Sequence, residues 1–508
     1  MLADLRTGLQ PLLWLLLALP FSDDEIVKEF KRYFRKYKDT PTRVEAIAAL
    51  EDAQSIEVVD VLVPLLKDKQ IEVVDAAVQV LAHFENEGAI QHLLLRLESA
   101  KDPRRRVGML RAVAEAGYPG SRNVLIPLLE DGNWDVRRRT IQGLRKHKGP
   151  EVEAAIVALC QDKEAAVRCE ALDALAYFGS KKVLPPARTD LVHEVWQVRA
   201  SAIAALSQVR DRDSIEPLLE RLDLEDGRLR KDIGDALGEI TGRNFGQRVD
   251  AWKRFWEIYK DRFKIPTDQE LKVLRQKQKE RKEFYAPPKG AVTYHGVDTP
   301  SRSIIFVIDV SGSMEQEITE KDLFDEGDYP SLQRIDIIKT ELIRTIEGLE
   351  SYVKYNVLSF ATEVKPWKKS LVRANPLNRS SAVTWIKRLE AIGGDSKQEL
   401  ARAGLVGAAN LEAGKTNSFG ALMAALGVDE KKGAEKGYTV DVDTIFFLSD
   451  GYPSYGRFIE TDDVLREVRK ANQLRGVVIH TIALGEFEKD FMRRLAHENG
   501  GTFVDLGS

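Results

Sequence analysis

The sequence predicts a multidomain protein in which an all-α solenoid precedes an α/β doubly wound, Rossmann-like domain. Three observations lead to this prediction. The chain has 508 residues, enough for about three domains of ordinary size. Arginine recurs with a period of 31 residues through the first half, and after residue 303 short β-rich apolar runs alternate with helical stretches.

The composition narrows the classes of function. The chain has 76 Lys and Arg residues and 80 Asp and Glu residues, which gives a formal charge of -4. It therefore lacks the excess of basic residues that is typical of nucleic-acid-binding proteins. Two cysteines exclude a disulfide framework and a four-thiolate zinc site. Cys160 and Cys169 both lie in alanine- and leucine-rich helical sequence, which favours two core residues and leaves a bond between them open.

Residues 1–22 resemble a signal peptide. Residues 11–21 form an uncharged apolar run, shorter than the ~20 residues of a membrane-spanning helix. Asp4 beside Arg6 and the lack of a small-x-small cleavage site depart from the pattern, and a buried first helix is the alternative. Ser22 to Glu25 read as a capping box that opens a helix through about residue 37. We expect an exported protein, periplasmic or extracellular, with the cytoplasm as the alternative and membrane contact at most through this segment.

The 31-residue repeat indicates pairs of helices. Each copy carries apolar residues at helical spacing, and a second apolar helix precedes it in several copies, at residues 61–66, 124–129 and 215–219. Two helices per repeat predict an α-solenoid. The repeated residues are Arg106, Arg137, Arg168, Arg199 and Arg230, with Leu144, Leu175, Leu206 and Leu237 seven positions after four of them.

These repeats resemble the short HEAT-repeat family, also called PBS-lyase-like HEAT repeats, and weaker copies near Arg43 and Val74 extend the array. We assign residues 23–245 to the solenoid. The resemblance implies stacked helix pairs with a long concave surface that docks a protein. We interpret the repeating arginine as a structural ladder that pairs with carboxylates or carbonyls of a neighbouring helix, in preference to a basic groove. The lyase activity does not carry over, because the repeats hold no site centred on cysteine or histidine.

Residues 246–297 are expected to form a cap and linker. Trp252 and Trp256 share one helical face and predict a cap on the last repeat. Residues 253–283 carry 11 Lys or Arg and 6 Asp or Glu, which favours a solvated helix over contact with anionic lipid or nucleic acid. Pro287, Pro288 and Gly290 end that helix and put a domain boundary near residue 297.

Residues 298–508 show the pattern of an α/β domain. Apolar strands separated by helices predict a parallel sheet covered on both faces, with ligand chemistry at the carboxyl ends of the strands. The strands are expected at residues 304–309, 355–361, 444–449, 477–483 and 502–505, and amphipathic helices at 333–349 and 462–474.

Polar residues follow two of these strands. Asp309, Ser311 and Ser313 come at the end of the first strand, Thr416 heads a later helix, and Asp450 ends another strand. This pattern resembles the von Willebrand factor type A domain and its metal-ion-dependent adhesion site, Asp-x-Ser-x-Ser with a distant Thr and a distant Asp. The resemblance implies that the hydroxyl oxygens ligate a divalent cation and that the aspartates act directly or through water. The metal residues expected on this basis are Asp309, Ser311, Ser313, Thr416 and Asp450.

The donor types suit that chemistry. Oxygen ligands favour Mg²⁺, with Ca²⁺ or Mn²⁺ as alternatives. Three neutral hydroxyls and two aspartates leave the ion electrophilic enough to accept a carboxylate from a partner protein. Two stretches, near Asp325 and near Asp395, depart from the family pattern and are expected to overhang the ion.

No catalytic motif accompanies this set. The sequence has no Gly-x-Ser-x-Gly elbow, no phosphate-binding Gly-x-x-x-x-Gly-Lys and no His-Glu-x-x-His, and His480 is expected to be a core residue. We therefore expect a non-enzymatic interaction or adhesion protein, with an acidic partner group at the metal and a second protein on the solenoid. The alternatives are an accessory subunit of an ATP-driven complex of the chelatase or MoxR-like kind and, from the family name alone, a chromophore-lyase-like enzyme.

Overall fold

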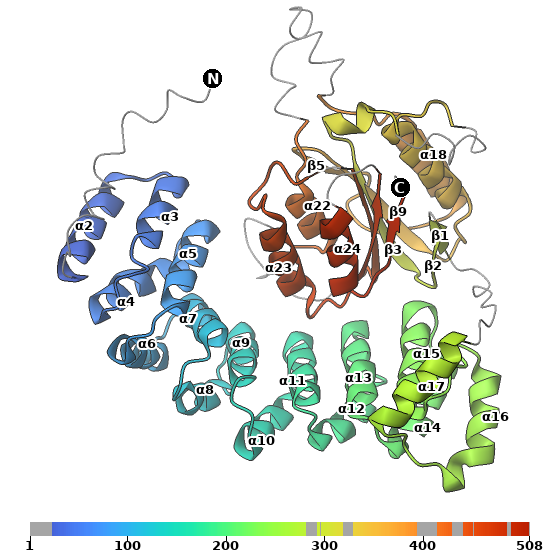
Figure 1. Ribbon diagram of the computed structural model, residues 1–508, viewed down its shortest axis with the longest axis horizontal. Coiled ribbons are helices and arrows are strands. Elements are labelled where there is room, and N and C mark those ends of the chain that lie inside the picture. The colour runs from blue at the N-terminus through green and yellow to red at the C-terminus, as the bar shows by residue number, and fades with distance from the viewer. Residues whose placement is uncertain are drawn as a thin grey trace, which may run out of the picture. The chain divides into compact units, whose positions relative to one another are not determined.

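The computed structural model describes residues 23–280, 292–294, 296–318, 329–393, 414–428, 440–450, 452–484 and 489–506 (Figure 1). The segment that resembles a signal peptide and the stretches near Asp325 and Asp395 lie outside the described residues. Within those ranges no helix is both long enough and apolar enough to cross a membrane. Contacts divide the chain into two units, Met1–Lys182 and Val183–Ser508.

The first unit is built from helix pairs, as the repeat predicts. Helices α3, α5, α7, α9 and α11 pack in succession, and α8 and α10 pack on α9 and α11. Helix α2 begins one residue after Ser22, where the capping box predicts a helix. The helices are α2 (Asp23–Lys36), α3 (Thr40–Ala48), α4 (Ile56–Leu62), α5 (Ile71–Ala82), α6 (Glu87–Ser99), α7 (Pro103–Ala116), α8 (Ser121–Leu128), α9 (Trp134–Leu144), α10 (Pro150–Leu159) and α11 (Ala165–Tyr177).

The arginine ladder is confirmed as a structural feature at three of its five predicted positions, Arg106, Arg137 and Arg199. Arg137 donates two hydrogen bonds of 2.7 Å to Asp162 and one of 2.8 Å to the carbonyl of Asp131. Asp162 also accepts a bond from the amide of Glu164, so the same carboxylate shapes the turn before the next helix. Arginine thus joins one repeat to the next. Equivalent ion pairs join Arg43 to Asp68, Arg106 to Asp131 and Arg199 to Glu225.

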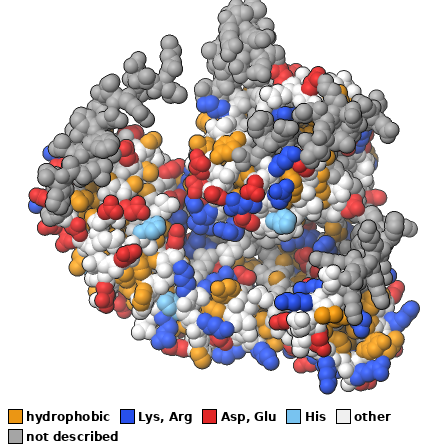
Figure 2. Space-filling model, viewed as in Figure 1, with side chains coloured by type: hydrophobic (Ala, Val, Ile, Leu, Met, Phe, Trp, Pro, Cys, Tyr) orange, Lys and Arg blue, Asp and Glu red, His pale blue; other side chains and the backbone are white. Residues whose placement is uncertain are grey.

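The structure also agrees with the sequence in the burial of the two cysteines and in the mixed charge of the surface. Cys160 and Cys169 are buried, as expected of core residues. Figure 2 shows Lys and Arg side chains interspersed with Asp and Glu on the visible described surface, in keeping with the small formal charge.

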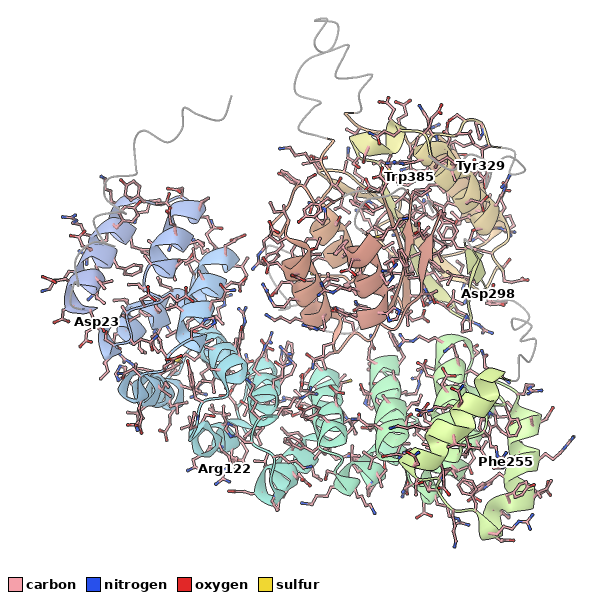
Figure 3. All side chains as sticks on the ribbon, in the orientation of Figure 1. Asp23, Arg122, Phe255, Asp298, Tyr329 and Trp385 are labelled. Atoms are coloured by element: carbon pink, nitrogen blue, oxygen red, sulfur yellow. The ribbon has the colours of Figure 1, made fainter. Side chains whose placement is uncertain are left out.

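The second unit begins with the last repeats. The aromatic residues predicted to cap them are buried, since Trp252 and Trp256 are 1% and 6% exposed, and Phe255, labelled in Figure 3, packs on Phe245. The charged segment is not one continuous helix, because Pro266 interrupts it. Its second half, α17, is mostly exposed, as expected of a solvated helix, and exposed ion pairs join it to the repeats. The helices are α12 (Leu184–Asp190), α13 (Trp196–Val209), α14 (Ile215–Leu224), α15 (Gly227–Thr241), α16 (Val249–Tyr259) and α17 (Asp268–Glu280).

A seven-stranded sheet forms the core of the rest of this unit. Its order is β5-β4-β3-β7-β8-β9, with β6 also paired to β4. The five predicted strands are present and parallel: β3 (Ser303–Asp309), β4 (Lys354–Phe360), β7 (Thr444–Ser449), β8 (Val478–Ala483) and β9 (Phe503–Asp505). The prediction of a wholly parallel sheet is wrong at one edge, where β5 (Val364–Pro366) and β6 (Val372–Arg373) run antiparallel to β4. Each of these two strands holds one valine followed by a Lys or Arg, so neither produces a readable apolar run.

Helices cover both faces of this sheet, which confirms the doubly wound fold (Figure 1). Tyr329 and Trp385, labelled in Figure 3, pack on the face that α18 and α19 cover. The hairpin of β1 (Val292–Tyr294) and β2 (Val297–Thr299) adds Tyr294, which stacks edge-on against Phe306. The covering helices are α18 (Arg334–Glu347) and α19 (Pro376–Lys387) on one face, and α22 (Ser418–Ala425), α23 (Thr461–Asn472) and α24 (Lys489–Glu498) on the other.

Within the second unit, the last repeats contact the amino end of strand β7. The indole nitrogen of Trp196 donates a 2.8 Å hydrogen bond to the carbonyl of Val440, and the Gln197 amide donates one of 3.0 Å to the same oxygen. Arg228 donates to the carbonyl of Asp443 at 3.2 Å. These contacts lie at the end of β7 opposite to the end that carries Asp450.

Candidate metal centre

The candidate site lies at the carboxyl ends of β3 and β7. Asp309 is the last residue of β3, and Asp450 directly follows β7, the neighbouring strand. The chain passes from β3 to β4 on one side of β3 and later returns to β7 on the other side. Open α/β sheets bind ligands at such a reversal, because the loops diverge there and leave a crevice.

The Asp-x-Ser-x-Ser segment turns sharply after β3. The carboxylate of Asp309 accepts a 2.8 Å hydrogen bond from the amide of Ser311, and a short 3-10 turn over Gly312–Glu315 follows. The hydroxyl oxygens of Ser311 and Ser313 lie 3.2 Å apart. The turn therefore brings two hydroxyl oxygens together next to a buried carboxylate.

Asp309 is fully buried, and its surroundings disfavour the charged form. Its second carboxylate oxygen accepts a 2.6 Å hydrogen bond from the hydroxyl of Ser449. Burial, and after it the negative charge of Asp450, raise the pKa of Asp309 from 3.8 to about 7, although bonds from Ser311 and Ser449 oppose the rise.

Asp450 is held by two side chains from distant parts of the sequence. The hydroxyl of Ser313 donates to one of its oxygens at 2.8 Å, and a guanidinium nitrogen of Arg334 donates to the other at 2.6 Å. Burial raises the pKa of Asp450, while the bond and the positive charge of Arg334 act in the opposite direction. The site therefore contains two buried carboxylates and one buried cation.

Thr416 reaches the same end of the sheet through backbone bonds. The amide of Gly312 donates to the carbonyl of Gly414 at 3.1 Å, and the amide of Asn417 donates to the carbonyl of Ala361 just after β4. Ser454, in the loop that follows β7, accepts a 2.9 Å bond from the amide of Thr416. Three loops thus meet around this threonine.

The structure joins four of the five predicted residues, Asp309, Ser311, Ser313 and Asp450, through hydrogen bonds that involve their side chains, and holds the fifth, Thr416, through its backbone. Sequence reasoning missed Ser449, Arg334 and Ser454. One signal for Arg334 was available, because an arginine at the first residue of an apolar helix opposes the helix dipole and calls for an acidic partner.

This donor set fits a hard divalent cation. It supplies hydroxyl and carboxylate oxygens, the ligands that Mg²⁺, Ca²⁺ and Mn²⁺ prefer, and its carboxylates carry raised pKa values that a nearby cation would lower. The described residues contain no cluster of three or more His, Cys, Asp or Glu side chains that could hold a metal. His480 is a core residue, as predicted: it is 7% exposed, and its ring stacks on Phe446.

Comparison with protein families assigns both halves of the chain. The model for HEAT repeats matches residues 33–114, 93–165, 122–189 and 152–238, and the model for the von Willebrand factor type A domain matches residues 302–505. The chain combines HEAT repeats with a von Willebrand factor type A domain. The described sheet and its helices lie almost wholly within the range of the second match.

Curated relatives share a stretch as long as the von Willebrand factor type A domain. Inter alpha-trypsin inhibitor heavy chain 4 of Mus musculus is 26% identical over 206 residues, which are 40% of this chain and 18% of the relative. Von Willebrand factor A domain-containing protein 3A of Homo sapiens is 26% identical over 205 residues, which are 39% of this chain and 13% of the relative. The chain thus spans less than one fifth of the length of these relatives.

Solved structures are similar over parts of the chain. An aerotolerance-related membrane protein from Bacteroides fragilis covers 40% of this chain and 90% of its own, with 13% identity and a TM-score of 0.26. A likeness of that size carries no conclusion about the function of this chain.

Proposed function

We propose that this chain is a non-enzymatic interaction protein, whose von Willebrand factor type A domain binds an acidic group of a partner protein through a divalent metal ion. Asp309, Ser311, Ser313, Thr416 and Asp450 would hold the ion, with Mg²⁺ the first candidate and Ca²⁺ or Mn²⁺ the alternatives. The supporting observation is the pair of buried carboxylates joined to two hydroxyls at the reversal point of the sheet.

The bound ion would supply a Lewis-acidic centre for an outside carboxylate. The chain's own residues prepare that centre: Ser449 and the amide of Ser311 fix the two oxygens of Asp309, and Ser313 and Arg334 fix those of Asp450. Because three of the five side chains are uncharged hydroxyls, they leave most of the ion's charge for an outer ligand.

The surface beside the site also suits a protein partner. Tyr452 and Tyr455, in the loop after β7, are 42% and 43% exposed, and the amide of Tyr455 donates to the carbonyl of Thr416. Exposed tyrosines are enriched in protein interfaces, where the ring supplies contact area and the hydroxyl a hydrogen bond.

The HEAT repeats would provide a second docking surface. Tyr177 at the end of α11 is 65% exposed, and the guanidinium of Arg145 lies 5.7 Å from its ring centre. Tyrosine and arginine are both enriched among the residues that contribute most to binding at protein interfaces, so this exposed pair suits a docking surface. We further propose an exported protein, on the basis of the amino-terminal sequence alone.

The metal site is tested by calorimetric titration of Mg²⁺, Mn²⁺ and Ca²⁺ into the full chain. We expect saturable binding by the wild type, loss of binding in Asp309→Ala, and wild-type binding in Asp441→Ala, which removes an exposed carboxylate just before β7. Equal titrations of the wild type and Asp309→Ala would overturn the proposal.

The acidic partner group is tested with acetate on the Mn²⁺-loaded chain. A carboxylate that enters the coordination shell displaces water, so we expect acetate to reduce the water proton relaxation caused by the bound Mn²⁺. Acetamide has the same size without the charge and serves as the control. An equal effect of the two molecules would argue against recognition of a carboxylate.

A further inference from the structure

Arg334 forms a buried ion pair inside the candidate metal centre. Its guanidinium lies 2.6 Å from Asp450, and the two residues are 5% and 2% exposed. Asp450 is its only ion-pair partner within the described part of the chain, where its Nε atom is buried without a hydrogen bond. Within the described residues, the charge of Arg334 is therefore paired with one carboxylate of the site, that of Asp450.

The position of Arg334 is costly without that partner. It is the first residue of α18, where the helix dipole is positive and disfavours a cation. Its neighbours Ile335, Ile337 and Ile338 are buried and offer the charge no solvation. Asp450 supplies the compensating charge.

The segment that carries the serines also fixes Arg334. The amide of Arg334 donates a 3.0 Å bond to the carbonyl of Gln316, and Glu317 pairs with Gln333 in an isolated β-bridge. Gln316 follows Ser313 by three residues, so the guanidinium and the serine hydroxyls are held in one local frame.

Arg334 changes the charge of the site by one unit in every state. With both aspartates ionised, Arg334 and the two carboxylates together carry a net charge of minus one before a divalent ion binds, and the loaded site carries plus one afterwards. Without it, the corresponding charges would be minus two and zero. A cation beside the ion weakens binding of the metal and strengthens binding of an anion to the loaded site, and a buried setting weakens screening of both effects.

We propose that Arg334 is a positioning residue that serves as an internal counter-cation: it stabilises Asp450 in the metal-free chain, lowers the affinity for the divalent ion, and keeps the loaded site positively charged so that it favours an anionic partner group. This inference rests on the proposed metal site. It goes beyond that site because it assigns opposite effects on metal affinity and anion affinity to one residue.

Two substitutions separate charge from orientation. Arg334→Gln removes the charge but retains an N–H donor for Asp450, whereas Arg334→Lys retains the charge but loses the planar guanidinium. We expect the full-length Gln variant to bind Mg²⁺ about tenfold more tightly or better in calorimetry and to melt at a lower temperature without metal. The Lys variant should bind Mg²⁺ as the wild type does.

Acetate provides the second readout, on the same chains loaded with Mn²⁺. The Gln variant should bind acetate more weakly than the wild type, although it binds the metal more tightly. A residue that only orients Asp450 would weaken metal binding when replaced, as loss of an outer-shell partner commonly does. Equal or weaker Mg²⁺ binding by the Gln variant would overturn the inference.

Failure of this inference and failure of the metal site differ in outcome. Absence of Mg²⁺ binding in the wild type and in both variants would overturn the site itself and the inference with it. Wild-type binding that Arg334→Gln leaves unchanged would overturn the role of Arg334 alone.

Discussion

The hydroxyl of Ser449 donates a 2.6 Å hydrogen bond to Asp309 across two neighbouring strands, β7 and β3. Both residues are buried, at 2% and 0% exposure. Together with the bonds from Ser311, this hydrogen bond stabilises the charged form of a carboxylate which burial would otherwise hold protonated. Ser449 directly precedes Asp450, and its hydroxyl lowers the pKa of Asp309, the other carboxylate of the candidate site.

The stability of the metal-free chain should depend on pH through Asp309. Its pKa is 3.8 when exposed and about 7 in the fold, so between those values the folded chain holds a proton that the unfolded chain releases. This contribution to the free energy of unfolding is fully present below about pH 4 and is lost as the pH rises to about 7.

Urea unfolding from pH 4 to pH 8 in the presence of a chelator measures that slope. Asp309→Asn should reduce it, because the amide does not titrate, and the remainder should come from other buried carboxylates with raised pKa values, such as Asp450. Ser449→Ala should move the upper end of the window to higher pH, since it removes a bond that lowers the pKa. Identical slopes for the wild type and Asp309→Asn would refute the assignment.

Arg137→Ala should destabilise the repeats of the first unit. Arg137 and Asp162 are 8% and 6% exposed, so the substitution leaves a buried carboxylate without its cation, at a cost of about 3 kcal/mol or more. Thermal unfolding followed by helical circular dichroism tests this. Arg122→Ala is the control in the same unit, because its ion pair with Glu151 is exposed, at 48% and 64%, and should leave a smaller loss. Equal losses would mean that the buried ion pair contributes little.

Gly414→Ala should damage the loop that carries Thr416. A Cβ atom at Gly414 would lie 2.1 Å from the carbonyl oxygen of Ile392, so the backbone would have to move, at a cost of about 1–3 kcal/mol. We expect a lower melting temperature and weaker metal binding. Gly348→Ala is the control, because its nearest atoms lie at 3.5 Å, an ordinary contact. A Gly414 variant with wild-type melting and metal titration would contradict this geometry.

Trp196→Phe should loosen the contact between the last repeats and the sheet. The change keeps an aromatic ring but removes the donor to Val440, a loss of about 1 kcal/mol. Amide hydrogen exchange should become faster in residues 440–444. The control Trp252→Phe removes an indole donor to Gly246 within the cap and should leave that exchange unchanged. The same exchange in residues 440–444 for Trp196→Phe and the wild type would count against the contact.

Periodic and local patterns in the sequence were sufficient for the architecture. The 31-residue period predicted the helix pairs and the arginine ladder, because each repeat presents the same side chain to the same neighbour. The five apolar runs predicted the parallel strands, because strands buried on both faces must be continuously apolar. The short strands β5 and β6 left no such run and were missed.

For the candidate site, the sequence by itself determined which oxygen-bearing side chains follow β3 and β7, since a turn after a strand is encoded locally. Only the tertiary structure decided the electrostatics. Ser449 lies 140 residues from Asp309, and Arg334 lies 116 residues from Asp450. These pairs exist because β7 returns beside β3 and α18 begins next to both. Hydrogen bonds and charges act over a few ångströms in space, so the strand order that brings distant residues together sets the pKa values and net charge of the site.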